Sequence, residues 1–521
     1  MNFFSVEFII LLTISLVAYY TVPKKVQWIC ILCANIVFYA FTGISNSFFI
    51  FASAFTTFYG ARVIGSLESD FKEKKSSGNF SKADLKAEKE KVKRKKRIVL
   101  LFVLLLDFGI LASLKYVPFL FFTGPKGLLL PLGISFYTFQ SFAYFMDVYN
   151  GKYESEQNFF KYFLFISFFP QLIQGPINRY NQLGKQLKET HSFNTENIKR
   201  GCLLILFGAL KKFVVADVLA KYIAAIFDGA YNNLPGSVIV LGILFYSAYQ
   251  YADFSGGIDM VLGVAKLFGL DMQPNFRQPY FSVSLAEFWR RWHISLGLWM
   301  KDYVFYPLAL TKTMQKMGKW CGDHWGKHFA RVIPAGFANI IVFLLVGIWH
   351  GPKLHFVLWG LYNGLIIALS DMLKPIFTRI MALLKIQTKS LPFYFFQIVR
   401  TFIIVNIGWY FDRIEDVQKC FRFLKNTFMH FGNPMMLFKK GSLKYVFAHL
   451  PDATPGAVLL VISGLIIFCV SVLKEKQIDV YASLCKKNIF VRLGTVYVLL
   501  VLVILSFSFA TGSTGFMYAQ Y

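Results

Sequence analysis

Long runs of apolar residues, separated by short polar segments, recur from one end of the chain to the other. Helices are predicted over residues 3–22, 26–41, 47–64, 98–116, 131–148, 159–173, 198–215, 238–251, 258–270, 337–349, 356–373, 393–411, 457–473 and 491–509. A helix needs ~17 to 25 apolar residues to cross a bilayer, so several of these runs are too short to cross alone. The pattern predicts about 11 to 13 crossings together with re-entrant or interfacial helices.

The composition is typical of a helical membrane protein. Hydrophobic residues make up 56% of the chain, charged residues only 16%, and the mean hydropathy is +0.51, which is outside the range of soluble globular proteins. Transmembrane β-barrels have short alternating segments in place of long apolar runs. The chain is therefore predicted to be an all-α integral membrane protein, with residues 1–521 forming a single membrane domain.

The formal net charge of +27 comes from polar segments between the apolar runs. In a membrane protein such an excess marks cytoplasmic loops and meets anionic lipid, so no nucleic-acid partner is expected. Lys24, Lys25 and the stretch 72–97 share one side if the first three runs cross in turn, which predicts a cytoplasmic location for them and an external N-terminus. Residues 66–97 are predicted to form a basic cytoplasmic insertion, either a helical hairpin or a partly ordered linker.

Residues 284–306 have an amphipathic pattern and are predicted to form one interfacial helix. Helical spacing places four side chains on its apolar face, and this turns the histidine inward: Trp289, His293, Leu296 and Met300. Arg290 and Arg291 are candidates for contact with the phosphates of a donor or with lipid headgroups, and lipid contact is the preferred interpretation.

His350 ends an apolar run and precedes Gly351 and Pro352, so a helix must stop or kink where the imidazole lies. An ionisable group at membrane depth needs a partner, a water-filled cavity or a function. Two interpretations follow for His350: a residue that lines an internal cavity, or one at headgroup level next to the interfacial Trp349.

Other polar residues within the apolar sequence are candidates for a supporting role. Asp253 and Ser255 are interpreted as helix-packing or supporting groups, and Asn275 and Gln278 as members of a polar turn that leads into the amphipathic segment. No metal site is predicted, although Cys321, Asp323, His324 and His328 have suitable spacing.

Nucleotide-binding and serine-hydrolase motifs are missing from the sequence, which argues against a nucleotide-driven pump and a serine hydrolase. Acidic residues within the apolar runs keep a secondary transporter or a polymer-export channel open as an alternative. These residues are Asp107, Asp147, Asp253 and Asp259.

Six stretches, in this order along the chain, carry a resemblance to a known family. They are Pro131–Gln140 (PLGISFYTFQ), Phe169–Ile177 (FPQLIQGPI), Tyr251–Gly256 (YADFSG), Asn275–Tyr280 (NFRQPY), Phe288–Leu296 (FWRRWHISL) and Gly347–Gly351 (GIWHG). The chain resembles the membrane-bound O-acyltransferases (MBOAT), in their bacterial polysaccharide-modifying branch, with the alginate O-acetyltransferases as the nearest group. The resemblance implies a helical bundle around a central tunnel.

The resemblance also implies residue roles. His350 takes the place of the family's catalytic histidine and His293 the other active-site position, on opposite sides of the tunnel. His350 is then the candidate general base, and a covalent acyl-imidazole is an open alternative. Trp289, Trp292 and Trp349 would line a narrow passage that excludes water. The C-terminal stretch Gly515–Tyr521 resembles an aromatic tail of this branch, in which Tyr518 and Tyr521 are candidates to relay the acyl group; an interfacial anchor is the alternative.

The implied reaction is acyl transfer across the cytoplasmic membrane of a bacterium. Acetyl-CoA or a carrier-protein thioester would donate an acyl group, most simply acetyl, from the cytoplasmic side, and no tightly bound cofactor is expected. The acceptors would be hydroxyl groups of an extracytoplasmic polysaccharide, reached directly or through a partner acyltransferase. D-alanyl transfer to teichoic acid is the alternative within the enzyme class.

Overall fold

The computed structural model describes residues 5–41, 43–77, 80–116, 131–229, 234–432 and 453–508. The regular elements of these ranges are helices, which confirms the predicted all-α class. As far as its residues are described, the chain forms two compact units. One contains Met1–Cys202 and Val261–Gln273, and the other contains Leu203–Met260 and Pro274–Met517.

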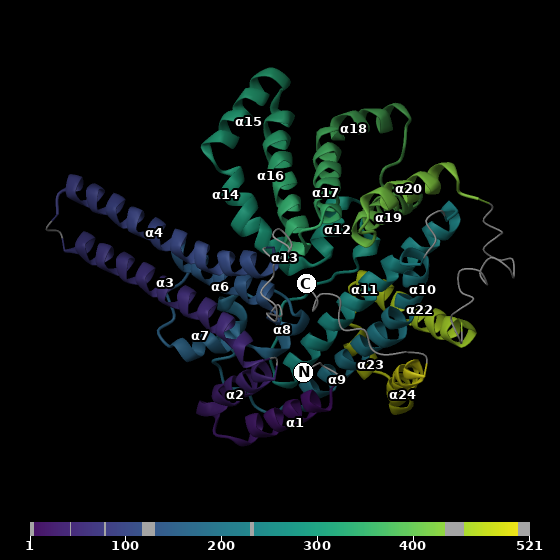
Figure 1. The fold of residues 1–521 in the computed structure, drawn as a ribbon, viewed down its shortest axis with the longest axis horizontal. Coiled ribbons are helices and arrows are strands. Elements are labelled where there is room, and N and C mark those ends of the chain that lie inside the picture. The colour runs from purple at the N-terminus through teal and green to yellow at the C-terminus, as the bar shows by residue number, and fades with distance from the viewer. Residues whose placement is uncertain are drawn as a thin grey trace. The chain divides into compact units, whose positions relative to one another are not determined.

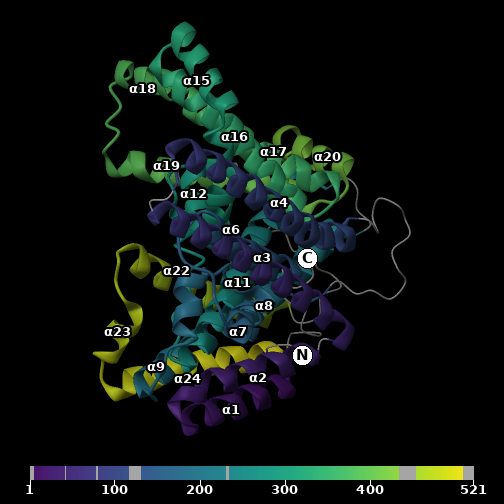
Figure 2. The same cartoon turned by 90° about the vertical axis from the view of Figure 1, so that its left-hand side faces the viewer.

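The first unit is built from helices near the N-terminus. They are α1 (Val6–Thr21), α2 (Gln27–Ala40), α3 (Ile44–Ser76), α4 (Lys82–Lys115), α6 (Ile134–Tyr149), α7 (Phe159–Ile166), α8 (Phe169–Gln174) and the first part of α9 (Thr195–Ala209), with a π-helical turn at Tyr180–Gly184. Helices α1 and α2 lie side by side (Figure 2), and α6 packs against both α3 and α4.

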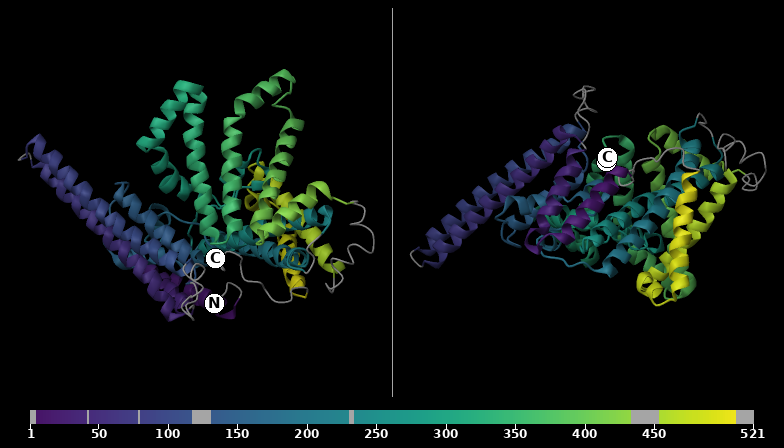
Figure 3. Two further views of the ribbon diagram at one scale, coloured as in Figure 1. Left: turned by 45° about the horizontal axis from the view of Figure 1, so that its top comes forward. Right: turned by 90° about the horizontal axis from the view of Figure 1, so that it is seen from below.

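The predicted basic insertion at 66–97 lies in a long antiparallel hairpin, which α3 and α4 form without a break from their apolar halves (Figures 1 and 3). Ser81 and Asp84 make a capping box that starts α4. Lys96 joins the two helices through Glu68, 2.5 Å away, and also donates to the Tyr149 carbonyl at 2.7 Å. The hairpin alternative is therefore correct in form, and its cytoplasmic location stays a prediction.

The second unit contains the remaining helices. They are the end of α9, a π-helical turn η3 (Leu210–Ala216), α10 (Asp217–Phe227), most of α11 (Gly236–Leu267), α12 (Leu285–Arg291), α13 (Ile294–Met300), a π-helical turn at Lys301–Phe305, α14 (Tyr306–Ala309), α15 (Lys312–Trp325), α16 (Lys327–His350), α17 (Leu354–Met372), α18 (Lys374–Leu383), α19 (Leu391–Arg413), α20 (Val417–Met429), α22 (Ala453–Glu475), α23 (Val480–Cys485) and α24 (Ile489–Phe507).

Two predicted runs have different boundaries in the structure. Residues 159–173 form two short helices, because the chain turns at Ser167 and Phe168 before Pro170 enters the first turn of α8. Conversely, the separate runs 238–251 and 258–270 belong to the single helix α11. The polar residues between those two runs are buried within α11 and do not mark a break.

Helices α16 and α17 form a tight antiparallel pair, which fixes the end of α16 (Figure 1). A Cβ atom on Gly347 would lie 2.3 Å from the Phe356 carbonyl oxygen, and one on Gly360 would lie 2.3 Å from the Phe343 carbonyl oxygen. Only glycine allows the two backbones to come this close. His350 is the last residue of α16, as predicted from the Gly351 and Pro352 that follow it.

Seven helices in the described ranges are long and apolar enough to cross a membrane. They begin at Asn46, Lys82, Lys327, Leu354, Leu391, Gly456 and Ile489, and α1 is a shorter apolar helix. These helices support a multi-pass membrane protein. The predicted total of about 11 to 13 crossings stays a prediction.

Candidate active site

His293 lies at a break between two helices and not within one. Its backbone is in the left-handed region, with φ of 47° and ψ of 52°, where it caps the N-terminus of α13. Non-glycine residues seldom adopt this conformation, which occurs more often at functional sites. The prediction of one continuous interfacial helix over 284–306 is therefore wrong, and the helical-face argument for His293 fails with it.

A short pairing between two segments holds this break in place. Phe276 forms an antiparallel bridge with Trp292, the Arg277 amide donates to the Arg291 carbonyl at 2.9 Å, and the Ile294 amide donates to the Asn275 carbonyl at 3.0 Å. These two backbone hydrogen bonds thus fix the residues on both sides of His293.

Asn275 also determines the tautomer of His293. The Ser295 amide and hydroxyl donate to Asn275 Oδ1 at 3.0 and 2.9 Å, so that atom is the amide oxygen. His293 Nδ1 lies 3.3 Å from the same oxygen. Because the oxygen can only accept, Nδ1 carries the proton, and the lone pair of the neutral ring is on Nε2.

Burial makes the neutral ring the stable form of His293. The residue is 4% exposed. Removal from water disfavours the imidazolium and lowers the pKa of His293 to about 3. The site therefore contains an uncharged imidazole throughout the physiological pH range.

Trp349 brings His293 and His350 into one cluster. The Trp349 ring centroid lies 6.2 Å from the His293 ring and 5.0 Å from the His350 ring. His350 is 7% exposed, so both histidines are buried. The His350 ring packs among aromatic side chains of the second unit, and its position along an internal cavity stays a prediction.

The aromatic wall around His350 includes residues that the sequence analysis did not select. The Trp359 ring lies 5.2 Å from the His350 ring and 5.3 Å from the Trp289 ring. Trp289 donates through Nε1 to Asn363 Oδ1 at 3.0 Å. Trp359 and Asn363 are four residues apart on α17. This spacing, shortly after the apolar run that ends at His350, was the available sequence signal.

Trp292 has a different place from the other predicted tryptophans. It is 2% exposed and packs edge-on against Phe276 at 5.0 Å and parallel to Phe288 at 5.5 Å. Phe254 joins this group and also meets the His293 ring edge-on at 4.8 Å. Trp292 therefore contributes to the packing that supports the His293 loop.

Asp253 and Ser255 point toward two buried lysines. Lys212 Nζ lies 2.6 Å from Asp253 and 2.9 Å from Asp217, and Lys211 Nζ lies 2.6 Å from Asp259 and 3.1 Å from Ser255. Both lysines are on the π-helical turn η3, which faces α11. We call these residues the lysine–aspartate network. The sequence analysis missed the lysines, although an adjacent Lys-Lys pair in an apolar run is itself a signal.

Arg290 and Arg291 differ in their surroundings. Arg291 is bound by Glu475 at 2.8 Å and Glu287 at 2.6 Å, and it contacts the Gln278 carbonyl at 3.5 Å. Arg290 is exposed. The half-buried Gln278 has a left-handed backbone, with φ of 40°. Thus Arg291 and Gln278 anchor the loop, and Arg290 is the arginine that is open to a ligand or to lipid.

Two further groups of residues come from the sequence: the C-terminal aromatic stretch and the residues with metal-ligand spacing in α15 and α16. Tyr518 and Tyr521, with the stretch Gly515–Tyr521, lie outside the described residues. Among the residues that are described, no three His, Cys, Asp or Glu side chains gather as a metal site. His328 contacts the Asp371 carbonyl at 3.1 Å, and Cys321 is buried in α15, which is helical and not a loop.

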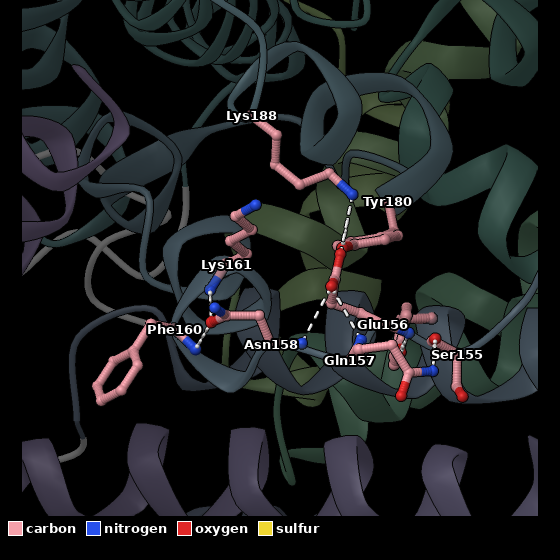
Figure 4. Close-up of polar contacts among 9 residues, drawn as sticks. Ser155, Glu156, Gln157, Asn158, Phe160, Lys161, Tyr180 and Lys188 are labelled. Atoms are coloured by element: carbon pink, nitrogen blue, oxygen red, sulfur yellow. Dashed lines mark hydrogen bonds and ion pairs between the residues drawn. The ribbon is translucent and has the colours of Figure 1, made fainter. Parts of the chain in front are cut away.

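A separate charged cluster in the first unit surrounds Glu156 (Figure 4). Tyr180 and Lys188 point at its carboxylate, with distances of 2.5 and 2.8 Å to Oε2, and the amides of Gln157 and Asn158 donate to Oε1 at 2.8 and 3.0 Å. Burial alone would raise the pKa of Glu156, but these hydrogen bonds outweigh it and lower the pKa to about 2. The cluster holds the loop before α7 to the π-helical turn.

Comparison with known proteins identifies the family. The sequence model of MBOAT, the membrane-bound O-acyltransferase family, matches residues 155–411, a range that includes both histidines. Over this range the chain belongs to the membrane-bound O-acyltransferase family, as the resemblance implied.

Relatives of this chain modify cell-surface polymers. It is 35% identical to a probable alginate O-acetylase of Pseudomonas aeruginosa over 304 residues, which is 58% of this chain and 52% of that protein. It is 30% identical to a peptidoglycan O-acetyltransferase of Helicobacter pylori over 370 residues, covering 63% and 64%. It is 29% identical to a teichoic acid D-alanyltransferase of Bacillus subtilis over 245 residues, covering 46% and 59%. The chain spans about half the length of the alginate O-acetylases that it matches.

Proposed function

We propose that the protein is a membrane O-acyltransferase that moves an acetyl group from a cytoplasmic thioester toward hydroxyl groups of an extracytoplasmic polysaccharide. The observation that carries the proposal is the buried cluster in which Trp349 contacts both His293 and His350. Family membership over residues 155–411 and the names of the relatives support the same class of reaction.

In the proposed mechanism His350 is the general base. A hydroxyl group is a poor nucleophile at neutral pH, and an imidazole that removes its proton during attack lowers the barrier. The acceptor oxygen attacks the thioester carbonyl, its proton passes to His350, and the carbon–sulfur bond breaks. His350 then returns the proton to the departing thiolate.

His293 acts as a hydrogen-bond acceptor in this mechanism and does not polarise the donor carbonyl. A group that polarises the thioester carbonyl must donate a hydrogen bond to it. The Nδ1–H group of His293 is directed at Asn275 instead, and the ring is neutral. The lone pair on Nε2 suits a hydrogen-bond acceptor instead. We therefore assign His293 to orienting the acceptor hydroxyl, and Asn275 to holding the ring in that tautomer.

The aromatic residues protect the donor in this proposal. Trp349 and Trp359 pack against His350 with large apolar surfaces, and Trp289 packs against Trp359 and is fixed by Asn363. Exclusion of water prevents hydrolysis of the thioester and strengthens electrostatic interactions in the site. Arg290 remains a candidate for donor phosphates or lipid.

The proposal also includes the donor, the membrane, the partner and the relay residue. The donor is acetyl-CoA or a carrier thioester, the membrane is the bacterial inner membrane with the N-terminus outside, and a partner acyltransferase hands the acetyl group to the polysaccharide. Tyr518 or Tyr521 is proposed as the relay hydroxyl.

The test uses inside-out membrane vesicles that contain the full chain and receive isotope-labelled acetyl-CoA. Wild-type vesicles should transfer label to glycan, and His350→Ala should reduce the transfer by at least about 100-fold because the base is lost. His324→Ala is the matched control, since His324 is exposed on α15 and outside the site. Undiminished transfer by a folded His350→Ala variant would reject the proposed base.

The same vesicles separate the alternatives. Label that moves from a D-alanyl carrier thioester, and not from acetyl-CoA, would assign the chain to D-alanyl transfer, which the Bacillus subtilis relative supports. Polymer export that persists in the His350→Ala variant but stops in Asp253→Asn would favour the transporter interpretation. Equal labelling from both membrane faces would contradict transfer across the membrane.

A further inference from the structure

An open groove of about 510 Å³ lies where two membrane-spanning helices end on the same side. Helices α16 and α17 are antiparallel, so the beginning of α16 and the end of α17 lie together, and His328 binds the Asp371 carbonyl at 3.1 Å across this junction. Helix α18 follows α17 at once (Figure 1). Its residues Lys374, Pro375, Thr378, Arg379 and Ala382 line the other side of the groove. The groove thus lies at one end of two helices that are long and apolar enough to cross a membrane.

Three basic residues are among those that line the groove. Arg331 of α16 faces Lys374 and Arg379 of α18 across it, and His328 and Thr378 complete the polar lining. The lining side chains include no carboxylate. In the part of the chain that the structure describes, none of these three cations forms an ion pair.

Helix α18 leaves its apolar side chains exposed. Its basic face lines the groove, while its apolar side chains point away from the protein: Ile376, Phe377, Ile380 and Leu383 are 54%, 50%, 44% and 74% exposed. In water an amphipathic helix would turn its apolar face to the protein core. The reverse arrangement is typical of a helix that lies in the membrane interface.

We propose that this groove binds the phosphate headgroup of an anionic phospholipid. Arg331 and Arg379 can each present paired N–H donors to phosphate oxygens, and Lys374 adds a third charge. The acyl chains would then lie along Ile376, Phe377 and Ile380, whose exposure is otherwise unfavourable. A soluble phosphate ligand would use the three cations but not the apolar rim, and for this reason we assign the groove to a lipid.

The test measures lipid bound to the purified full-length protein in mild detergent. Mass spectrometry should detect bound phosphatidylglycerol or cardiolipin in the wild type, and Arg331→Gln/Lys374→Gln/Arg379→Gln should lower its occupancy about tenfold or more. The control Lys312→Gln/Lys316→Gln/Lys319→Gln removes the same charge from exposed positions of α15 and should keep the lipid. If the triple groove variant does not fold, Arg331→Gln alone serves, with a smaller expected loss.

A second arm distinguishes the sources of phosphate. Added phosphatidylglycerol should raise the melting temperature of delipidated wild type but not of the groove variant, and phosphatidylcholine should have little effect on either. Equal lipid occupancy in wild type and groove variant would overturn the proposal. Stabilisation by inorganic phosphate or coenzyme A that displaces the lipid would also overturn it, in favour of a soluble ligand.

Discussion

The histidine cluster and the lysine–aspartate network are both buried in the second unit, and α11 contributes to both through neighbouring residues. Phe254 meets the His293 ring, whereas Asp253 and Ser255 on either side of it face the two lysines. The network is charged and held by contacts of 2.6 to 3.1 Å. The histidine cluster contains the neutral His293 ring and is shaped by aromatic packing and a left-handed backbone.

This difference separates a structural from a chemical use of buried polar groups. Buried charges are stable only when they are paired, so the lysines and aspartates are committed to each other and fix α11 against η3. Neutral imidazoles cost less to bury and keep a lone pair for proton transfer. We therefore expect changes in the network to affect folding first, and changes around the histidines to affect activity first.

Breaking the network should have the largest effect on stability. Lys212→Met leaves the carboxylates of Asp253 and Asp217 without their shared cation, and the expected loss is about 3–5 kcal/mol in the free energy of unfolding. The measurement is thermal unfolding in detergent together with the yield of folded protein.

The matched variant Lys212→Met/Asp217→Asn/Asp253→Asn removes all three charges. It should recover a large part of the lost stability, because no uncompensated charge remains. If the triple variant is as unstable as Lys212→Met, shape and not charge governs this region, and the distinction drawn above fails.

Changing the charge beside His293 should affect activity and its pH dependence. Asn275→Asp keeps an acceptor for Ser295 and for His293 Nδ1–H, but it adds a negative charge that favours the imidazolium. The pKa of His293, lowered to about 3 in the wild type, should rise. Activity should then fall as the pH drops toward and below neutrality, and the wild type should show no such limb from His293.

Asn275→Ala provides the comparison for this change. It removes the support of the ring without a charge, and we expect a loss of activity of about 10-fold to 100-fold at every pH, since small displacements at a reacting centre are costly. Identical pH profiles for Asn275→Asp and the wild type would argue that His293 has no part in the reaction.

The smallest expected effect on activity is at Glu156 of the first unit. This carboxylate is charged and hydrogen-bonded, but it takes no part in the proposed reaction. Its folded-state pKa is lowered to about 2 from an ordinary 4.5, so its stabilisation is present above pH 4.5 and is lost as the pH falls toward 2. Glu156→Gln should cost about 1.5–3 kcal/mol at pH 7 and less at pH 3.5. Unfolding measurements at both pH values test this, and acyl transfer at saturating donor should change little.

Much of the site was predictable from the sequence because local rules apply to it. The end of α16 at His350 follows from Gly351 and Pro352, and the burial of His350 follows from the apolar run before it. The break at His293 was not predictable from periodicity, because its cause is the pairing of Phe276 with Trp292. These two residues are too far apart in the sequence for helical periodicity to relate them. Similarly, no local signal matches Arg291 with Glu475, 184 residues away.

The sequence by itself determined the helical membrane class and the family, and it selected the two histidines as candidates, because hydrophobic runs and short motifs are properties of neighbouring residues. The tertiary structure alone decided the tautomer of His293, the pairing of Lys211 and Lys212 with the aspartates, and the direction of the basic face of α18. These features depend on atoms that meet only after distant segments have packed, where burial and hydrogen bonding determine which charges are tolerated.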